Sequence, residues 1–568
     1  MPPGASLSWI TYEAEAGATN AQIIAPNITI GSFASESSGR QSVRLHALGH
    51  FVEVIAKQSA NSVVVRYSIP DSSNSTTLGV YVNGNWRAML NLTSRFGWDY
   101  GWAIPYAETP AGGVAHHFFD DARALVGAIP SGAAVRVQVD APVPNAYYIV
   151  DLIDLELVSP PLPQPSNSLS ILSFRAGKGG GNDDRAAIQS TIDEAKKRKM
   201  SVWIPPGRYN VGSDGQLTSH SGVAVYAAGM WHSTLHGNTR WSCEGGGCSW
   251  SDFAILGEAT NRVQGRTHGF MGGAGANTTL TNVWVEHTVC GYWVGPTPTT
   301  GLRIRGCRFR NTYADGVNLC NGASDSIVEQ SHFRNTGDDS IATWAPQSEG
   351  GVNTHNVFSH NTAQLPWRAN CFAIYGGKGH VIEDSLCVDV PTYPGVRVGS
   401  EFSSWPFEGT TTVRNTALVR AGGWFWKRPW GALVLNAEQS DISGIHVHNV
   451  SIESSSYAGV HLIGPHGINA TTLGSARITG SGTWGVEVAS DARGAATLHS
   501  VSIAASRTGA INNAAGSRFE LRQMSVGHGH LVTNADVRLR GPWYGAGTGD
   551  EYDEGGRRER LRKFDQLV

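Results

Sequence analysis

Residues 311–344 read NTYADGVNLCNGASDSIVEQSHFRNTGDDSIATW, and this stretch repeats itself. The dipeptide Asn-Thr at 311–312 returns at 335–336, and Asp315 returns as Asp339, in both cases 24 residues later. A turn followed by a short apolar strand, recurring at such a period, is typical of a solenoid whose coils stack on one another. The stretch therefore predicts a β-solenoid in which these two aspartates lie on neighbouring coils.

A column of small residues carries the repeat through most of the chain. Each member opens a short apolar strand, and successive members are 24, 31, 24, 36, 28, 26 and 24 residues apart. One coil cannot bury its apolar face alone, so stacking on its neighbours must stabilise it. We predict a right-handed parallel β-helix over residues 168–545. The column consists of Gly316, Ser340, Cys371, Gly395, Gly431, Gly459, Gly485 and Gly509.

The chain in front of the repeat has a different pattern. Residues 1–157 contain strands of five to eight residues with alternating polar and apolar positions, which predicts a β-sandwich. The Pro-rich segment 158–167 is stiff and marks a domain boundary. Residues 546–568 are rich in charge and are expected to form a surface tail. The predicted fold class is therefore all-β, with a sandwich followed by a β-helix.

Composition excludes several kinds of partner. The 568 residues include 69 glycines, 16% charged residues and a formal net charge of −3, which gives no reason to expect nucleic acid or an anionic membrane as partner. No stretch approaches the length of a membrane span. The first residues lack the charged and apolar regions of a signal peptide. We expect a secreted monomer whose signal has been removed.

The seven cysteines cannot all form pairs. Cys243 and Cys248 bracket a glycine-rich segment and are placed to close a small disulfide loop. The other five are interpreted as buried free thiols because they lie in apolar strands. These are Cys290, Cys307, Cys320, Cys371 and Cys387.

Three carboxylates gather in the repeated stretch of a chain that is poor in charge. Asp315, Asp338 and Asp339 have the side chains that glycoside hydrolysis needs, since one acid protonates the leaving oxygen while another activates water. In a regular strand Asp338 would point away from Asp339. Gly337 indicates a bend that turns both acids toward one cleft.

Two segments resemble known modules. Residues 182–209 resemble the entry of pectate-lyase-type β-helices, in which a helix caps the first coil. The segments YEAEA at 12–16 and YIVDLIDLE at 148–156 resemble the ends of carbohydrate-binding modules of families 6 and 35. That resemblance implies a structural Ca²⁺ held by Glu13, Glu15 and Asp151, since calcium prefers several oxygen ligands.

The acids and the sandwich together resemble glycoside hydrolase family 87, which contains α-1,3-glucanases and mycodextranases. An Asp followed one coil later by Gly-Asp-Asp is also the pattern of polygalacturonases and dextranases. The resemblance implies an inverting endo-hydrolase of α-1,3-glucan that needs no catalytic cofactor. Asp338 would be the general acid, and Asp315 and Asp339 would share the attacking water. Inversion usually requires acid and base about 6.5 to 9.5 Å apart.

Further residues are candidates for binding the glucan. Asn370 lies on the coil after Asp339. Arg397 matches an arginine that faces acidic sugars in polygalacturonases, but Gly399 stands where their lysine would be, which favours a neutral sugar unless Lys378 compensates. Aromatic rings that could stack on sugars fall on the coils after the acids. They are Trp344, Trp367, Tyr375, Tyr393, Trp405, Trp424, Trp426 and Trp430.

Several alternatives remain at this point. Mycodextranase or dextranase action would change the linkage that is cut. A polysaccharide lyase or polygalacturonase would act on a uronate, and a lyase would use Ca²⁺ at the acids with an Arg or Lys base. A non-catalytic β-helix would bind polysaccharide without cutting it.

Overall fold

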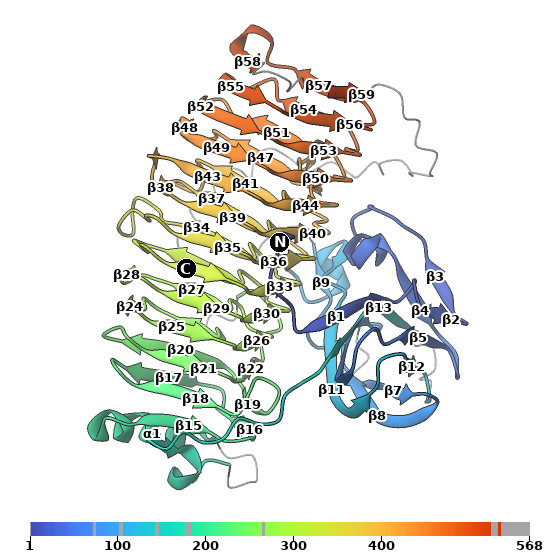
Figure 1. Ribbon diagram of the computed structural model, residues 1–568, viewed down its shortest axis with the longest axis vertical. Helices are drawn as coiled ribbons and strands as arrows, with labels where there is room; N and C mark the ends of the chain where they lie inside the picture. Colours follow the sequence, from blue (N-terminus) through green and yellow to red (C-terminus); the bar gives the residue numbers. More distant parts are fainter. Residues whose placement is uncertain are drawn as a thin grey trace.

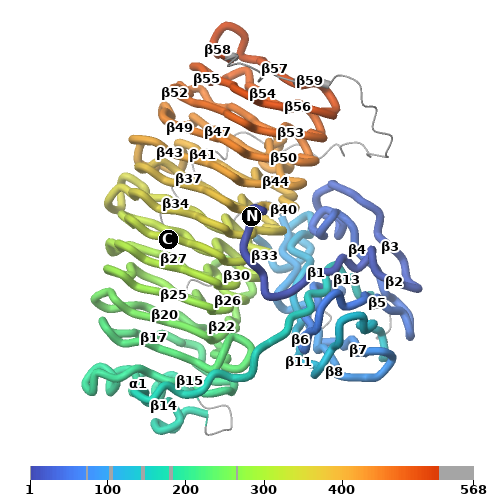
Figure 2. Tube along the Cα trace, in the orientation of Figure 1, coloured from blue at the N-terminus to red at the C-terminus, as the bar shows by residue number. Residues whose placement is uncertain are grey.

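Two bodies built of β-strands lie side by side, a tall stack of coils and a smaller sandwich against its middle (Figure 1). The computed structural model describes residues 2–71, 75–101, 106–141, 147–177, 183–263, 267–523 and 532–534. The predicted tail at 546–568 lies outside these residues. The chain leaves the sandwich after β13 and runs as an extended segment to the end of the stack that carries α1 (Figure 2).

The sandwich consists of two antiparallel sheets, as the alternating pattern predicts. One sheet has the order β11-β6-β13-β4-β3 with β1 beside β13, and the other has the order β2-β5-β12-β7-β8. Alternate valines such as Val135 and Val137 are fully buried between them. The strands, with the separate pair β9 and β10, are β1 Trp9–Glu13, β2 Ala18–Thr19, β3 Gln22–Ile24, β4 Ser42–Leu45, β5 Phe51–Ile55, β6 Ala60–Ser68, β7 Thr76–Val82, β8 Asn85–Leu92, β9 Asp99–Tyr100, β10 Ala115–His116, β11 Asp120–Ile129, β12 Ala134–Gln138 and β13 Tyr148–Glu156.

The stack is a parallel β-helix with three long sheets, to each of which nearly every coil contributes a strand. The first sheet contains β14 Ser168–Ser170, β15 Ser201–Ile204, β18 Ala224–Ala227, β21 Ser249–Ser251, β25 Thr279–Thr281, β29 Arg303–Arg305, β32 Ile327–Glu329, β35 Val357–Ser359, β39 Val381–Glu383, β43 Thr411–Arg414, β48 Ile442–Ser443, β49 Ile445–His448, β52 Gly467–Gly474, β55 Arg493–His499 and β58 Phe519–Gln523.

The second sheet faces the sandwich. It contains β16 Gly207–Asn210, β19 Ser233–His236, β22 Ala254–Leu256, β26 Trp284–Glu286, β30 Arg308–Arg310, β33 His332–Arg334, β36 Thr362–Gln364, β40 Leu386–Val388, β44 Ala417–Val419, β50 Ser451–Glu453, β53 Arg477–Thr479, β56 Ser502–Ala504 and β59 Val532–Asn534.

The third sheet follows the turns that carry the acids. It contains β17 Gly215–His220, β20 Thr239–Glu244, β23 Phe270–Met271, β27 Tyr292–Val294, β31 Val317–Cys320, β34 Ile341–Trp344, β37 Phe372–Tyr375, β41 Val396–Gly399, β47 Leu433–Asn436, β51 Val460–Ile463, β54 Trp484–Val488 and β57 Gly509–Asn513. Short pairs at the corners are β24 Gly275–Ala276 with β28 Thr299–Thr300, β38 Gly377–Lys378 with β42 Phe407–Glu408, and β45 Trp424–Phe425 with β46 Arg428–Pro429.

The register of the third sheet confirms most of the predicted column. Val317 lies beside Ile341, which lies beside Phe372, so the small residues before them are stacked. A Cβ on Gly316 would come within 2.5 Å of the Phe333 ring, which explains why the position is small. Two members of the column were wrong by one residue. The register places Ala432 and Ala510 in the column, in place of Gly431 and Gly509.

The apolar interior of the stack is closed at its first coil by a single α-helix. α1, Arg185–Arg198, buries Ile188, Ile192 and Ala195 against that coil, as the resemblance to β-helix entries implied. Among the described residues, no helix has the length and hydropathy to cross a membrane.

Two disulfides are present, and one of them corrects the sequence analysis. Cys243 and Cys248 pair as predicted. Cys371 and Cys387, which were interpreted as free thiols, also form a disulfide. They belong to successive coils and both point into the interior, a proximity that their separate apolar contexts do not reveal. Cys290, Cys307 and Cys320 are buried and free.

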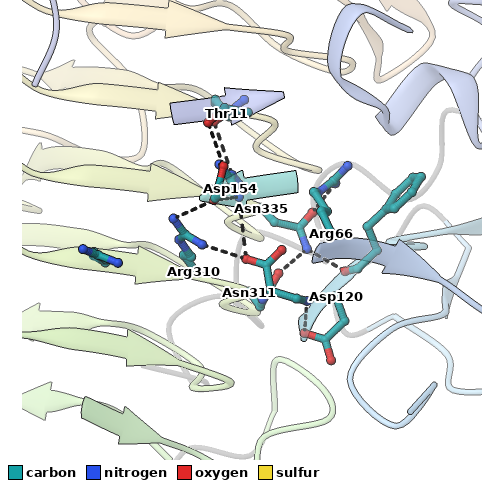
Figure 3. Close-up of polar contacts among 12 residues, drawn as sticks. Thr11, Arg66, Asp120, Asp154, Arg310, Asn311 and Asn335 are labelled. Carbon is teal, nitrogen blue, oxygen red and sulfur yellow. Dashed lines mark hydrogen bonds and ion pairs between the residues drawn. The ribbon is translucent and has the colours of Figure 1, made fainter. Parts of the chain in front are cut away.

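The sandwich is joined to the coils by buried charges (Figure 3). Arg310 lies beside Arg334 in the ladder between β30 and β33, so two like charges are stacked about 4.8 Å apart. Asp154 of the sandwich compensates both, with carboxylate oxygens 3.4 Å from Arg310 and 2.9 Å from Arg334. Asp121 adds a second contact to Arg310, at 3.2 Å. The coils therefore need the sandwich to neutralise this face.

We predict that Asp154→Asn destabilises the protein strongly, because it removes a carboxylate that contacts two buried guanidinium groups and leaves Asp121 to compensate both. Breaking a buried pair by removing one partner typically costs about 3 to 5 kcal/mol. Unfolding in denaturant, followed by tryptophan fluorescence, measures the change. Glu329→Gln is the control, since its ion pair with Arg305 is largely exposed and such pairs contribute little. Equal effects of the two substitutions would contradict the prediction.

Candidate active site

The stacking of coils places Asp315 and Asp339 in equivalent positions, each two residues before a strand of the third sheet. The Gly316 N–H donates to the Asp339 carbonyl oxygen at 3.0 Å, which fixes the two turns against each other. Both side chains are buried, with 4% and 3% of their surface exposed. The repeat of 24 residues therefore predicted this part of the site correctly.

Asp338 joins them because the chain bends at Gly337. A Cβ at Gly337 would lie 2.4 Å from the Trp367 ring and 2.5 Å from the Tyr313 carbonyl oxygen, so this close turn requires glycine. One oxygen from each of Asp315, Asp338 and Asp339 lies within 4.8 Å of the others. The bend expected from the sequence thus brings all three carboxylates together.

Asp339 is held by the next coil. Its Oδ1 accepts hydrogen bonds from the backbone N–H of Asn370 at 3.0 Å and from the Asn370 side-chain amide at 2.6 Å. Its Oδ2 accepts the Tyr375 hydroxyl at 3.0 Å. Burial and the nearby Asp338 raise the pKa of Asp339 to about 7, although these hydrogen bonds oppose the rise. Asn370 and Tyr375, predicted to contact substrate, therefore contact a catalytic candidate.

Two arginines that the sequence analysis missed bind Asp338. Arg262 places Nη2 2.5 Å from Asp338 Oδ2, and Arg368 places Nη1 3.5 Å from the same oxygen. Burial acts to raise the pKa of Asp338, but Arg262 and then Arg368 outweigh it and hold the pKa below its ordinary value. Arg368 lies two residues before Asn370, whereas Arg262 lies far upstream with no local signal.

The three acids therefore have different protonation tendencies. Burial, followed by Asp338 and Asp339, raises the pKa of Asp315 well above its ordinary value. Asp338 favours the charged form and Asp315 the neutral form, while Asp339, with a pKa of about 7, titrates near neutral pH. Carboxylates whose pKa values are pushed apart can serve as acid and base in one reaction. The arrangement is suited to general acid–base chemistry.

Comparison with known proteins identifies the chemistry. Residues 6–158 match the family model described as α-1,3-glucanase catalytic domain D1, and residues 183–517 match catalytic domain D2. The catalytic unit of a thermostable GH87 α-1,3-glucanase from Streptomyces thermodiastaticus is 30% identical, with a TM-score of 0.83 over 94% of this chain and 98% of that one. The chain belongs to glycoside hydrolase family 87.

Other solved structures of family 87 are similar along nearly the whole chain. A GH87 α-1,3-glucanase catalytic domain in complex with nigerose is 27% identical, with a TM-score of 0.84 over 92% of this chain and 99% of that one. A variant in complex with tetrasaccharides is 26% identical, with a TM-score of 0.85 over the same shares. Comparison with curated proteins gave no match. The family model that matches the sandwich is described as a catalytic domain and not as a binding module.

One of the predicted calcium ligands of this family-87 chain, Asp151, is already paired with an arginine. Asp151 is fully buried and its Oδ2 lies 2.5 Å from Arg66, while its Oδ1 accepts the Ser38 N–H. Glu13 accepts the Ser38 hydroxyl at 2.8 Å. Within the described residues, Glu13, Glu15 and Asp151 do not converge to the spacing of metal ligands. Arg66 supplies a positive charge to Asp151, whereas Glu13 Oε2 and Glu15 Oε2 are buried without a hydrogen-bond partner, so the calcium site stays a prediction.

In the described part of the chain, two groups of side chains have the spacing of metal ligands. The catalytic acids are one, and there Arg262 and Arg368 supply the compensating charge, so we assign no metal. Asp120, Glu286 and His287 are the other, at the junction of sandwich and coils. His287 Nε2 lies 2.7 Å from Asp120 Oδ1, and we interpret this group as an ion pair between domains.

The predicted cations for substrate are not free. Arg397 is 4% exposed and donates from Nε to Glu401 Oε2 at 2.6 Å, and its guanidinium lies over the Trp430 ring. Asn370 precedes β37, whereas Lys378 follows it, so the two residues lie at opposite ends of the strand. The Lys378 Nζ lies 3.8 Å from Glu408 Oε2. Neither Arg397 nor Lys378 therefore belongs to the cluster of Asp315, Asp338 and Asp339.

The predicted aromatic residues separate into buried and exposed groups. Trp367 is 2% exposed and packs beneath Gly337, so it supports the acid turn. Trp344 is partly buried and donates to the Phe402 carbonyl oxygen at 3.1 Å. Trp426, with 52% of its surface exposed, and Trp424, with 41%, remain available to stack on sugar.

We predict that Tyr375→Phe moves the alkaline limb of the pH profile of kcat/KM to higher pH. The substitution removes a hydrogen bond that favours charged Asp339, so the pKa of Asp339 rises further. Because Asp339 has a higher pKa than Asp338, its titration sets the alkaline limb. One hydrogen bond to a charged group is worth about 1.5 to 3 kcal/mol, or about one pH unit or more. Tyr457→Phe, at a partly buried tyrosine away from the acids, is the control. An unchanged alkaline limb would contradict this role of Tyr375.

Proposed function

We propose that this chain hydrolyses the α-1,3-glucosidic bonds of α-1,3-glucan. The convergence of Asp315, Asp338 and Asp339 in a member of family 87 carries the proposal. Relatives of this family are α-1,3-glucanases that bind nigerose and tetrasaccharides. The similarity extends over both domains, so the scaffold that holds the acids is common to these enzymes and this chain.

The spacing of the acids gives further support. Three variants of the related enzyme, each with one aspartate replaced by alanine, are described in complexes with nigerose or tetrasaccharides. The three replaced aspartates are separated by 23 positions and by one position. Asp315, Asp338 and Asp339 have the same separations. We therefore assign the reaction to these three residues.

The surroundings of the site favour a neutral sugar. A uronate would need a free cation for its carboxylate, as polygalacturonases provide. Arg397 is the residue that matches theirs, and Glu401 neutralises it in a buried pair. Arg262 and Arg368 are committed to Asp338. A neutral glucan needs no such cation, so these contacts argue against a polygalacturonate substrate.

In the proposed mechanism Asp338 gives its proton to the leaving glycosidic oxygen. Water attacks the anomeric carbon as that bond breaks, and Asp315 or Asp339 takes the proton of the water. The raised pKa values of Asp315 and Asp339 make them effective bases. The lowered pKa of Asp338 makes it a strong acid that is protonated in only a minority of molecules. Activity should therefore be highest in acidic solution.

We further propose that the reaction inverts the anomeric centre. The nearest oxygens of the three acids lie within 4.8 Å, which is closer than the usual separation of about 6.5 to 9.5 Å in inverting enzymes. This proximity is nearer to the separation of about 5 to 5.5 Å in retaining enzymes, so the proposal of inversion rests on the resemblance to inverting β-helical hydrolases and not on the distance. The anomeric configuration of the first product distinguishes inversion from retention.

We also propose where the enzyme acts and in what oligomeric state. An endo-acting enzyme on a long polymer meets its substrate outside the cell, so we propose a secreted monomer. Trp86, with 58% of its surface exposed, could bind glucan on the sandwich. Its contribution would be to retention on the polymer and not to bond cleavage.

Asp338→Asn should lower the release of reducing ends from α-1,3-glucan by at least about 100-fold, because it removes the proton donor. Asp325→Asn, at an exposed turn acid of the same coil, should keep wild-type activity. Nigeran, dextran and polygalacturonate serve as alternative substrates. Preference for any of them over α-1,3-glucan would contradict the assignment, and an unsaturated product absorbing in the ultraviolet would indicate a lyase.

Proton NMR of fresh wild-type product should show the β-anomer first. Inversion of an α-linkage gives this anomer before mutarotation. An initial α-anomer would mean retention and would assign one of the three aspartates as nucleophile.

A further inference from the structure

Arg262 reaches the proposed acid from a distant part of the chain. It belongs to the segment after β22 and contacts Asp338, which lies three coils further along the third sheet. Its side chain is 15% exposed, and its Nη2 lies 2.5 Å from Asp338 Oδ2. A contact this short between a guanidinium and a carboxylate is a strong, charge-assisted hydrogen bond.

The same guanidinium also binds both turns that carry the acids. Its Nη1 donates to the carbonyl oxygen of Tyr313 at 3.4 Å and to that of Gly337 at 3.3 Å. Tyr313 precedes Asp315 by two residues, and Gly337 directly precedes Asp338. Arg262 therefore contacts the two neighbouring coils at the points where the catalytic carboxylates leave the backbone.

Arg368 is a weaker partner of the same carboxylate. Its Nη1 is 3.5 Å from Asp338 Oδ2, and the guanidinium lies 5.6 Å from the centre of the Tyr106 ring. The two arginines approach one carboxylate oxygen from different coils, and Arg262 is nearer by 1.0 Å. Arg262 is therefore the principal counter-charge of Asp338.

We propose that Arg262 is a positioning residue of the hydrolysis, whose ion pair with Asp338 sets the pH below which the enzyme loses activity. The inference rests on the proposed function, because it concerns the residue that gives the proton. It assigns Arg262 no contact with the substrate.

Other ionisable groups face Asp338 and must be considered with it. Asp315 and Asp339 supply negative charge, while Arg368 supplies positive charge. The remaining groups are neutral near neutral pH because burial raises their pKa values. They are Tyr106, Cys290, Tyr375 and Tyr393.

The direction of the effect follows from the charge of Arg262. A cation beside Asp338 favours its carboxylate, so the proton is lost at a lower pH. Removing the cation lets Asp338 keep its proton to a higher pH. Because Asp338 has the lower pKa of the acid–base pair, its titration sets the acidic limb of kcat/KM, and that limb moves upward. Arg262 lowers the pKa of Asp315 to a smaller extent, so the alkaline limb moves less.

The experiment measures kcat/KM on soluble α-1,3-gluco-oligosaccharides from pH 3 to 9. In Arg262→Met the acidic limb should move upward by about one pH unit or more, as loss of an adjacent opposite charge does. Arg262→Lys keeps a positive charge and should keep the limb close to that of the wild type. Arg305→Gln, at an exposed arginine of the first sheet, is the control and should change neither limb.

Melting temperatures confirm that each variant is folded. If Arg262→Met does not fold, Arg368→Gln provides the second test, with a smaller upward movement because its contact is longer. An unchanged acidic limb in a folded Arg262→Met would overturn the proposal. Movement of the alkaline limb alone would also overturn it, because Asp338 would then not be the group that sets the acidic limb. A wild-type enzyme without activity on α-1,3-glucan would instead contradict the proposed function.

Discussion

Hydrogen bonding between parallel strands of successive coils is the constraint on which the site depends. The Gly316 N–H donates to the Asp339 carbonyl oxygen, so a turn of one coil is fixed directly over the equivalent turn of the next. This places carboxylates at a spacing of about 4.8 Å, far closer than their charges alone would favour. The stability of the ladder, built on a continuous apolar interior, holds the acids together against their repulsion.

The same stacking places like charges close together on two faces of the solenoid. Oppositely charged residues from elsewhere in the chain compensate them on both faces. On the third sheet, Arg262 and Arg368 compensate Asp338. On the second sheet the signs are reversed, and Asp154 of the sandwich compensates Arg310 and Arg334. In a solenoid, equivalent positions of successive coils often carry the same kind of residue. Charged positions therefore need oppositely charged partners from outside the repeat.

The sandwich is consequently part of the catalytic body. Arg66 of the sandwich donates to the Asn335 side chain at 3.1 Å, and Asn335 donates to Asn311 at 2.7 Å (Figure 3). These two asparagines begin the turns that carry Asp339 and Asp315. A buried hydrogen-bond network therefore extends from the sandwich to the catalytic turns, which gives a physical reason for the family model to count it as catalytic domain.

The sequence alone determined the coil period, the sandwich, the capping helix and the convergence of Asp315, Asp338 and Asp339. These features depend on patterns within one coil or between adjacent coils, where spacing in sequence becomes spacing in space. Only the tertiary structure decided the partners of these acids. Arg262 comes from three coils away, Asp154 from another domain, and Cys387 from the coil after Cys371. No local pattern encodes such contacts, because they arise from the path of turns whose lengths differ from coil to coil.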